Sequence, residues 1–449
     1  MLFLASLIFY GAWSRRYLLL FMFTMAVDYL AAMGISGTSN RRVAKLLLLL
    51  SIASNLTVLG IFKYFNFFAK SFQELMANFG VEVEPFLFDV ILPIGISFYT
   101  FQAMSYTIDV YRGKIQPCRD VLDYGLYVSF FPQLVAGPIE RATHLLPQVL
   151  KPRAVTLEKT RRGAYYFMWG LFMKVFVADN LAAIVDPVFA APPPYNGVTV
   201  LLAVYAFSFQ IFCDFAGYSA MATGLALAMG VDLMENFRRP YFSKNIASFW
   251  RRWHISLSSW FRDYVFMPYY VHVESRPWLR RLPIGLRHSL AFAITLLVTE
   301  YLLGLWHGAA WTFGNFGVYH AVLIWLYYQT RKLWDKMPGP LQVFLTYNLV
   351  CGGWLIFRAN SGEQVLEMGR ALLHNFDMAA APHAGEIAGQ IFAYVAILLV
   401  VQFFKERTND SLAVLRWPAP IRLAFIVLVG SLTLVFGDFS DRPFIYFQF

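Results

Sequence analysis

Charged side chains are scarce in this sequence of 449 residues. Only 14% of the residues are Asp, Glu, Lys or Arg, whereas 58% are hydrophobic, and the mean hydropathy is +0.52. A soluble globular domain has about a quarter charged residues, so this chain could not solvate its surface in water. The composition therefore excludes an ordinary soluble protein and predicts an all-α chain that crosses a lipid bilayer several times.

Cysteine and the common soluble-enzyme motifs are also lacking. The three cysteines, Cys118, Cys213 and Cys351, are far apart and show no CxxC spacing, which argues against a disulfide framework or a cysteine-based zinc site. The sequence contains no GxSxG, no GxxxxGK[ST] and no GxGxxG after a strand. These absences argue against a hydrolase, a P-loop motor and a dinucleotide-binding enzyme.

The charges that are present are mostly basic, and the formal net charge is +10. Basic loops that face the cytoplasm and anionic lipid head groups explain such a balance, and we favour them over nucleic-acid binding. The apolar run at 2–13 is short and follows no basic stretch. It is therefore interpreted as structure rather than as a cleavable signal peptide.

Long apolar runs occupy most of the chain. A membrane helix needs about 20 apolar residues, and by this rule we expect roughly ten to thirteen segments in a single membrane domain, residues 1–449. The run at 198–231 is long enough for two segments or for one long tilted helix. The candidates are 17–35, 46–68, 86–108, 124–131 extended towards 146, 163–182, 198–231, 289–306, 311–328, 341–357, 387–404 and 421–436.

Two stretches differ from simple membrane helices. Between Gly304 and Gly317, glycines coincide with polar side chains, and we expect broken helices that line a central tunnel, because lipid tolerates broken helices only around a cavity. In 249–264, aromatic residues recur at helical spacing opposite Arg251 and Arg262. This pattern predicts an interfacial helix at the membrane surface, and a basic lip over a tunnel is compatible with it.

His307 is the strongest candidate for chemistry. It follows eighteen residues whose only formal charge is Glu300, and a polar group at membrane depth is a functional candidate by default. A structural histidine that is hydrogen-bonded across helices fits the pattern equally well. A metal site shared with His320 is disfavoured, because thirteen residues of helix would separate the two side chains by about 20 Å along the axis. A general base that activates a hydroxyl suits a buried, neutral histidine.

Five short runs occur in an order and spacing that resemble the membrane-bound O-acyltransferase family, in its bacterial branch for alginate and other polysaccharides. The resemblance covers nearly the whole chain. The runs are 93–99 (PIGISFY), 131–139 (FPQLVAGPI), 235–237 with 240–241 (ENF and PY), 249–257 (FWRRWHISL) and 304–309 (GLWHGA).

The resemblance implies a membrane O-acetyltransferase with a function for each matching position. His307 corresponds to the family's catalytic histidine, His320 to the second histidine of that region, and His254 to the histidine of the Trp-His-x-Ser run in the cytoplasm-facing part of the tunnel. On this basis we expect His320 and Asn236 to position the donor or acceptor. We expect Arg251 and Arg252, with His254, to receive the anionic donor. The donor implied is acetyl-CoA, with no bound cofactor and no metal. The acceptor is a hydroxyl of a cell-envelope or exported polysaccharide, reached directly or through an extracytoplasmic acetyltransferase partner. The implied location is the bacterial inner membrane, in contact with lipid and not with nucleic acid.

The sequence departs from the family pattern at two places. Relatives usually begin with a further apolar segment before the one that resembles 4–13. We therefore expect either that the chain lacks one helix or that its start is placed too far downstream. A Pro-Leu-Gly-Gly-Asn run that commonly follows Arg-Asp-Tyr in relatives is replaced here by 267–270 (MPYY). This change affects the loop beside the expected tunnel and leaves His307 in place.

Three alternatives stay open at this point. The aromatic C-terminus suggests either an interfacial anchor or, at Tyr446, a transient acyl acceptor. A transporter or flippase with a proton relay between His307 and Glu300 is the competing function, and a scaffold for polysaccharide export is the third. Within the enzyme interpretation, the transferred group could also be D-alanyl from a carrier protein.

Overall fold

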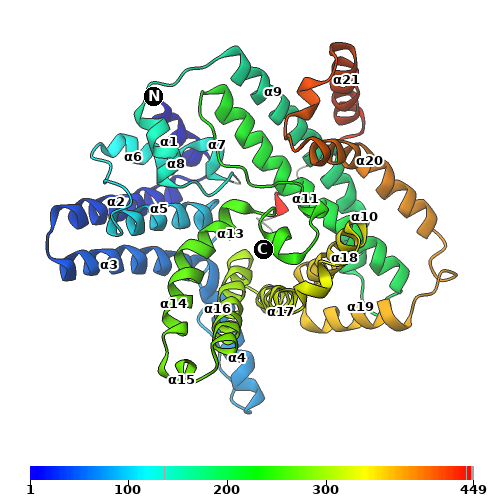
Figure 1. Ribbon diagram of the computed structural model, residues 1–449, viewed down its shortest axis with the longest axis horizontal. Helices are drawn as coiled ribbons and strands as arrows, with labels where there is room; N and C mark the ends of the chain where they lie inside the picture. Colours follow the sequence, from blue (N-terminus) through cyan, green and yellow to red (C-terminus); the bar gives the residue numbers. More distant parts are fainter. Residues whose placement is uncertain (136, 441, 446–449) are drawn as a thin grey trace. The chain divides into compact units, whose positions relative to one another are not determined.

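The computed structural model describes residues 1–135, 137–440 and 442–445, and these residues form helices and connecting loops without a strand (Figure 1). Within these described residues, eight helices are long and apolar enough to cross a membrane. The all-helical, multi-pass architecture expected from composition is therefore confirmed. The eight spans are Arg15–Gly37, Arg41–Asn78, Leu157–Ala190, Gly197–Ala228, Ile284–His307, Gly339–Arg358, Ala384–Thr408 and Ala419–Phe436.

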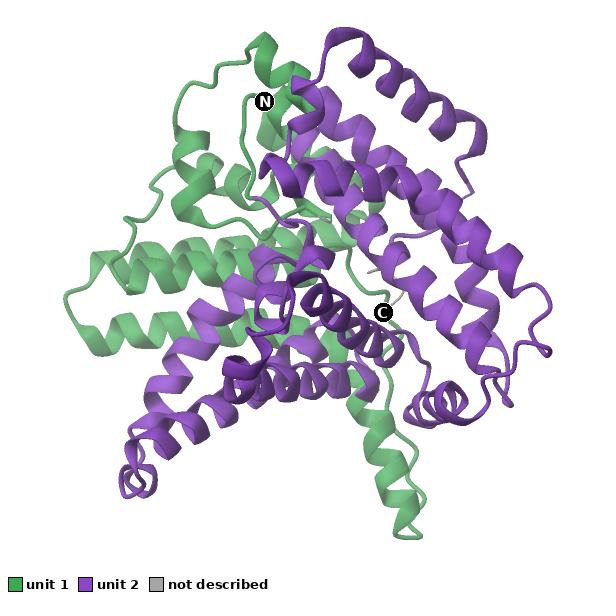
Figure 2. Ribbon diagram, turned by 45° about the vertical axis from the view of Figure 1, so that its right-hand side comes forward, with its two compact units in different colours: residues 1–163, 225–234 green, residues 164–224, 235–449 purple. Residues whose placement is uncertain are grey.

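The chain divides into two compact units, coloured separately in Figure 2. Unit 1 comprises residues 1–163 and 225–234, and unit 2 comprises residues 164–224 and 235–449. The single membrane domain and the central tunnel that we expect from the sequence both stay predictions.

Unit 1 contains the N-terminal helices, of which α2, α3 and α5 run side by side (Figure 1). Ser14 and Asn40 cap α2 and α3 by accepting hydrogen bonds from backbone N–H groups of the first turn. The helices of this unit are α1 (Leu2–Trp13), α2 (Arg15–Gly37), α3 (Arg41–Leu59), α4 (Phe65–Asn78), α5 (Ile96–Tyr111), α6 (Val121–Ser129), α7 (Phe131–Leu134) and α8 (Ala142–Leu150).

A buried carboxylate joins the three long helices of unit 1. Asp28 of α2 accepts hydrogen bonds from Ser51 and Asn55 of α3 and from Thr107 of α5, the last at 3.2 Å. All four side chains are almost fully buried. Because lipid offers no hydrogen-bond partner, such polar contacts hold membrane helices in register.

Two expected membrane segments of unit 1 are wrong. The segment 86–108 is helical only from Ile96, where α5 begins after Gly95, whose φ of 73° favours glycine. The segment 124–146 is broken into α6, α7 and α8, with Pro132 in the first turn of α7 and Pro147 inside α8. Proline interrupts the backbone hydrogen bonding that a single spanning helix would need.

Unit 2 contains the longest helix, α11. The run at 198–231, expected to form either two segments or one long helix, forms this one helix of 32 residues. The last four residues of α11 belong to unit 1. The helices of unit 2 are α9 (Leu157–Leu171, which begins in unit 1), α10 (Asp179–Ala190), α11 (Gly197–Ala228), α12 (Ile246–Trp250), α13 (Ile255–Phe261), α14 (Met267–Glu274), α15 (Pro277–Arg280), α16 (Ile284–His307), α17 (Trp311–Trp334), α18 (Gly339–Arg358), α19 (Gly362–His374), α20 (Ala384–Thr408) and α21 (Ala419–Phe436).

The single interfacial helix expected at 249–264 is also wrong. Helix α12 ends at Trp250, a turn follows, and α13 begins at Ile255. Phe249, Trp253 and Trp260 are buried within unit 2 rather than spread on a surface. Helical spacing of aromatic residues also arises when two short helices pack into the same core, so the pattern could not distinguish the two arrangements.

Candidate active site

His307 is the last residue of α16, and its side chain is only 2% exposed. The chain is extended at Gly308 and becomes helical again at Trp311, so the histidine lies at a genuine break between two helices. Gly304 and Gly317 do not line the expected tunnel, however. A Cβ at Gly304 or Gly317 would collide with the backbone of the facing helix, so these glycines serve the close crossing of α16 and α17.

Aromatic rings surround His307. The ring centroids of Trp306, Phe357 and Phe316 lie 5.3, 5.4 and 6.2 Å from the imidazole centroid. The imidazole of His254 lies 6.5 Å away, in the same group of buried rings. The structure therefore brings together two of the predicted histidines that are 53 positions apart in the sequence.

His254 owes its position to a strained turn. It occupies the left-handed region, with φ of 41°, between α12 and α13, and it is fully buried. A residue other than glycine adopts this conformation only where its surroundings hold it there, and such strain is common at functional sites. The side chain of Asn236 provides part of this support, because its Oδ1 atom lies 3.1 Å from His254 Nδ1.

Asn236 connects the turn to α11. Its Oδ1 accepts a hydrogen bond from Ser256 Oγ at 2.9 Å, and its Nδ2 donates to Ser219 Oγ at 3.1 Å. Its backbone carbonyl also accepts from Ile255 N at 2.9 Å. Because Oδ1 is an acceptor, His254 faces it with an Nδ1–H group, and the lone pair of the neutral ring lies on Nε2. Burial, with a smaller contribution from His307, holds the pKa of His254 well below its usual value.

His320 lies apart from this pair. Its Nδ1 accepts a hydrogen bond from Trp250 Nε1 at 3.3 Å. The ring of Phe316 contacts both histidines, with centroids 4.6 Å from His320 and 6.2 Å from His307. His320 can therefore act on His307 only through the intervening packing, which is a positioning role at most.

The two candidate donor-binding arginines point into different surroundings. Arg251 lines a cavity of about 390 Å³ together with Arg262, and Glu300 and Leu303 of α16 also line it. Leu303 lies one turn before His307. Arg252 does not line this cavity, because it pairs with Glu406 at 3.1 Å.

The C-terminal segment contributes to the same core, which the sequence did not reveal. Phe444 packs on Tyr218 and Phe215 of α11, with centroid distances of 4.5 and 5.6 Å, and the Phe215 ring lies 4.6 Å from His254. The backbone N–H of Ile445 donates to Asp214 Oδ2 at 2.7 Å. Tyr446, the candidate acyl relay, lies outside the described residues.

The Asp214 carboxylate that accepts from Ile445 N belongs to a buried ion cluster. Lys174 Nζ lies 2.7 Å from Asp179 Oδ1 and 2.5 Å from Asp214 Oδ1, and all three side chains are less than 10% exposed. Sequence reasoning missed these residues because they lie within two long apolar runs and share no motif. Their signal was the same as that of His307, namely an ionisable group at membrane depth.

No group of three or more His, Cys, Asp or Glu side chains suited to a metal ion occurs in the part of the chain that the structure describes. The arrangement offers instead two neighbouring imidazoles in a buried aromatic environment and an arginine-lined cavity along α16. Such a set can bind an anionic substrate and move a proton at a buried atom.

Comparison with known proteins gives a consistent result. The sequence profile of the membrane-bound O-acyltransferase family (MBOAT) matches residues 119–362. The chain is 36% identical to the "Probable alginate O-acetylase AlgI" of Azotobacter vinelandii, over 99% of this chain and 93% of the relative. It is 38% identical to the protein of the same name from Pseudomonas aeruginosa, over 91% and 76% of the two chains. It is 32% identical to the "Peptidoglycan O-acetyltransferase" of Helicobacter pylori, over 99% and 90%.

Proposed function

The chain belongs to the membrane-bound O-acyltransferase family, and we propose that it moves an acetyl group from a cytoplasmic thioester to a hydroxyl of a cell-envelope or exported polysaccharide. The protein is a multi-pass membrane O-acyltransferase. Acetyl-CoA as the donor, the bacterial inner membrane as the location and outward transfer are parts of the proposal.

One observation carries the assignment of the site: His307 and the His254–Asn236 pair converge in one buried, ring-lined environment. His307 is the residue that acts on the acceptor, as a general base. His254, kept neutral and oriented by Asn236, positions the imidazole of His307 or the thioester. A buried neutral imidazole is competent to accept a proton near neutral pH.

The reaction balances without a further reagent. His307 accepts the proton of the attacking hydroxyl, the hydroxyl oxygen forms a bond with the thioester carbonyl carbon, and the carbon–sulfur bond breaks. The departing thiolate takes up the proton, so that an alcohol and a thioester become an ester and a thiol. If the acceptor is a partner protein or Tyr446 of this chain, the same step loads the relay, and a second transfer passes the group to the glycan.

The cavity beside Arg251 supports the path of the donor. Arg251 and Arg262 place two guanidinium groups on its wall, of which Arg262 is already paired with Asp263 at 2.8 Å. Residues of α16 up to Leu303, one turn before His307, also line it. An anionic donor would bind its phosphates at the arginines and extend its thioester arm along α16. Arg252 is assigned a supporting role, since its guanidinium is already engaged by Glu406.

The structure offers little support for the transporter alternative. Glu300 precedes His307 by seven residues of one helix, which is about 10 Å along the axis. The two side chains therefore need intermediates to exchange a proton. An acyltransferase family assignment accounts for the buried histidines without that relay.

The test replaces His307 by Ala, with His374→Ala as the matched control, because His374 is an exposed histidine at the end of α19. We expect the His307 variant to insert at the normal level and to transfer no acetyl group, while the control transfers normally. Radiolabelled acetyl-CoA supplied to membrane vesicles gives the readout. Full transfer by the His307 variant would refute the assignment, and an intact thioester with the unaltered protein would refute the proposed function.

A further inference from the structure

A second cavity in unit 2 lies away from the histidines. It has a volume of about 930 Å³, is partly open, and is lined by α11, the turn at Pro240–Phe242, α18 and α20. Neither His254 nor His307 lines it. Its walls are mostly aromatic and aliphatic, with Phe209, Phe212, Tyr241, Phe344, Tyr347 and Leu398 among the lining residues.

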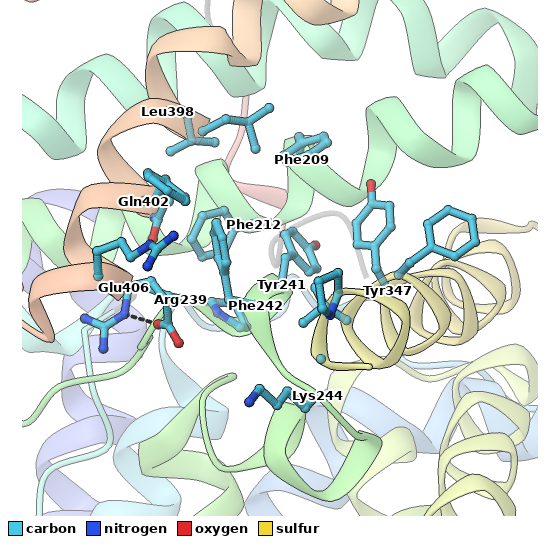
Figure 3. Close-up of a pocket in the computed structure, with 18 residues that line it drawn as sticks. Phe209, Phe212, Arg239, Tyr241, Phe242, Lys244, Tyr347, Leu398, Gln402 and Glu406 are labelled. Carbon is cyan, nitrogen blue, oxygen red and sulfur yellow. Dashed lines mark hydrogen bonds and ion pairs between the residues drawn. The ribbon is translucent and has the colours of Figure 1, made fainter. Parts of the chain in front are cut away.

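The cavity is apolar at one end and charged at the other. Along α20, Leu398, Gln402 and Glu406 follow at intervals of four residues and so lie on one face. Over these eight residues, about 12 Å of helix, the lining changes from aliphatic to ionic. Figure 3 shows Leu398 and Phe209 at one end, and Arg239, Glu406 and Lys244 towards the other. A ligand of this cavity must therefore be amphipathic.

The charged end has an excess of positive charge. Arg239, Lys244 and Arg407 face a single carboxylate, Glu406. That carboxylate is already shared, because Arg239 Nε lies 2.6 Å away and Arg252 Nη1 lies 3.1 Å away. Lys244 and Arg407 are exposed at this end, and no carboxylate of the described residues lies within ion-pair distance of either. Two cations at the mouth are therefore available for an anion.

The two helices that bound the cavity are both candidate membrane spans, Gly339–Arg358 and Ala384–Thr408. The basic end lies at the first turn of α18 and the last turns of α20, so it is at an end of each span, where lipid head groups lie. Basic pockets between membrane helices bind anionic lipid head groups. We propose that this cavity binds one anionic phospholipid, with its phosphate at Lys244 and Arg407 and an acyl chain along the aromatic wall.

The bound lipid would affect the active site through aromatic rings that line the cavity and also pack on the residue before His254. The rings of Tyr241 and Phe212 line the cavity, and each also lies 6.1 Å from the ring of Trp253, which precedes His254. An empty cavity leaves this aromatic layer without contacts on one side. Acyl transfer should therefore be faster in bilayers that contain anionic phospholipid than in neutral ones.

The primary test measures lipid binding directly, so it does not depend on the proposed function. The purified full chain is titrated with phosphatidylglycerol and with phosphatidylcholine, and bound lipid is counted by native mass spectrometry. The variant is Lys244→Gln with Arg407→Gln. The matched control, Lys332→Gln with Lys336→Gln, removes the same charge from exposed residues at the end of α17 that do not line the cavity.

We expect one phosphatidylglycerol to bind in preference to phosphatidylcholine, and the cavity variant to bind it about thirty-fold more weakly, as two basic contacts predict. The control should bind as the unaltered protein does. A third variant, Val343→Trp, fills the cavity without changing charge and should also lose the bound lipid. Equal binding by the cavity variant and the control, or equal binding of the two lipids, would overturn the proposal, whatever the outcome for acyl transfer.

Discussion

The ion cluster of Lys174, Asp179 and Asp214 gives the sharpest prediction about stability. In Lys174→Met, two buried carboxylates lose the cation that they share. Removal of one partner from a buried ion pair costs about 3–5 kcal/mol, because the remaining charge stays buried without compensation. We expect the free energy of unfolding of the Lys174→Met variant, measured by titration with a denaturing detergent, to fall by about that amount.

The same variant should release the C-terminal segment. Asp214 accepts the hydrogen bond from Ile445 N and is held in place by Lys174. Phe444 is only 1% exposed, so chymotrypsin can cleave after it only when the segment detaches. We expect faster cleavage after Phe444 in Lys174→Met, while cleavage after Phe439, which is already exposed, should hardly change.

Two triple variants that carry no charge in the cluster separate the docking of the C-terminal segment from the stability of the fold. We call them the Asn cluster and the Leu cluster. Lys174→Met with Asp179→Asn and Asp214→Asn removes all three charges and keeps an oxygen that can accept from Ile445 N. The Leu cluster carries Lys174→Met and Asp179→Asn with Asp214→Leu, so it lacks that oxygen. Both should recover most of the lost stability, since neutral replacement of a buried ion pair is tolerated. The Leu cluster should be cleaved after Phe444 about fivefold to tenfold faster, as expected for the loss of one hydrogen bond.

The consequence for activity follows from the packing of Phe444 against Phe215, whose ring abuts His254. A detached segment should lower kcat for acetyl transfer and leave the KM for the donor unchanged. The reasoning is refuted if Lys174→Met keeps its normal stability, or if the Asn and Leu clusters are cleaved at the same rate.

Two further predictions concern other parts of the molecule. Arg251→Gln should raise the KM for the acyl donor about tenfold, as the loss of one charge-assisted contact predicts. Arg252→Gln should mainly lower stability. Steady-state kinetics and thermal unfolding distinguish the two variants, and equal KM values would contradict the donor path. In unit 1, the hydrogen bond that His144 donates to Glu140 raises the pKa of His144 above 6.5, and burial raises the pKa of Glu140 above 4.5. Both groups hold protons more tightly in the folded state, so stability should fall as pH rises through these values. The part of this fall above pH 6.5 should disappear in His144→Gln, and an unchanged pH profile would show that the pair is not coupled to folding.

Composition was sufficient to predict the class of fold, because the scarcity of charge leaves a chain of this length no stable state in water. Among the described residues, eight helices have the length and hydropathy of a membrane span, fewer than the roughly ten to thirteen segments expected, and the difference has a physical reason. Hydropathy registers the apolar character of 86–108 and 124–146, but it does not register the chain breaks at Gly95, Pro132 and Pro147. Apolar side chains in short helices of a core give the same signal as those that face lipid.

The candidate site shows a similar division between what spacing can and cannot predict. The burial of His307 at a helix end follows from one polar residue after a long apolar run, so it could be anticipated. The partnership of Asn236 with His254 depends on a left-handed turn between two helices, and no periodicity indicates that conformation. The rotation argument placed His320 about 20 Å from His307 along one unbroken helix. The chain instead breaks at Gly308, and the ring of Phe316 contacts both imidazoles. In the proposed mechanism, His307 depends on residues from a distant turn of the chain, so variants of Asn236 should affect transfer as directly as variants of the histidines.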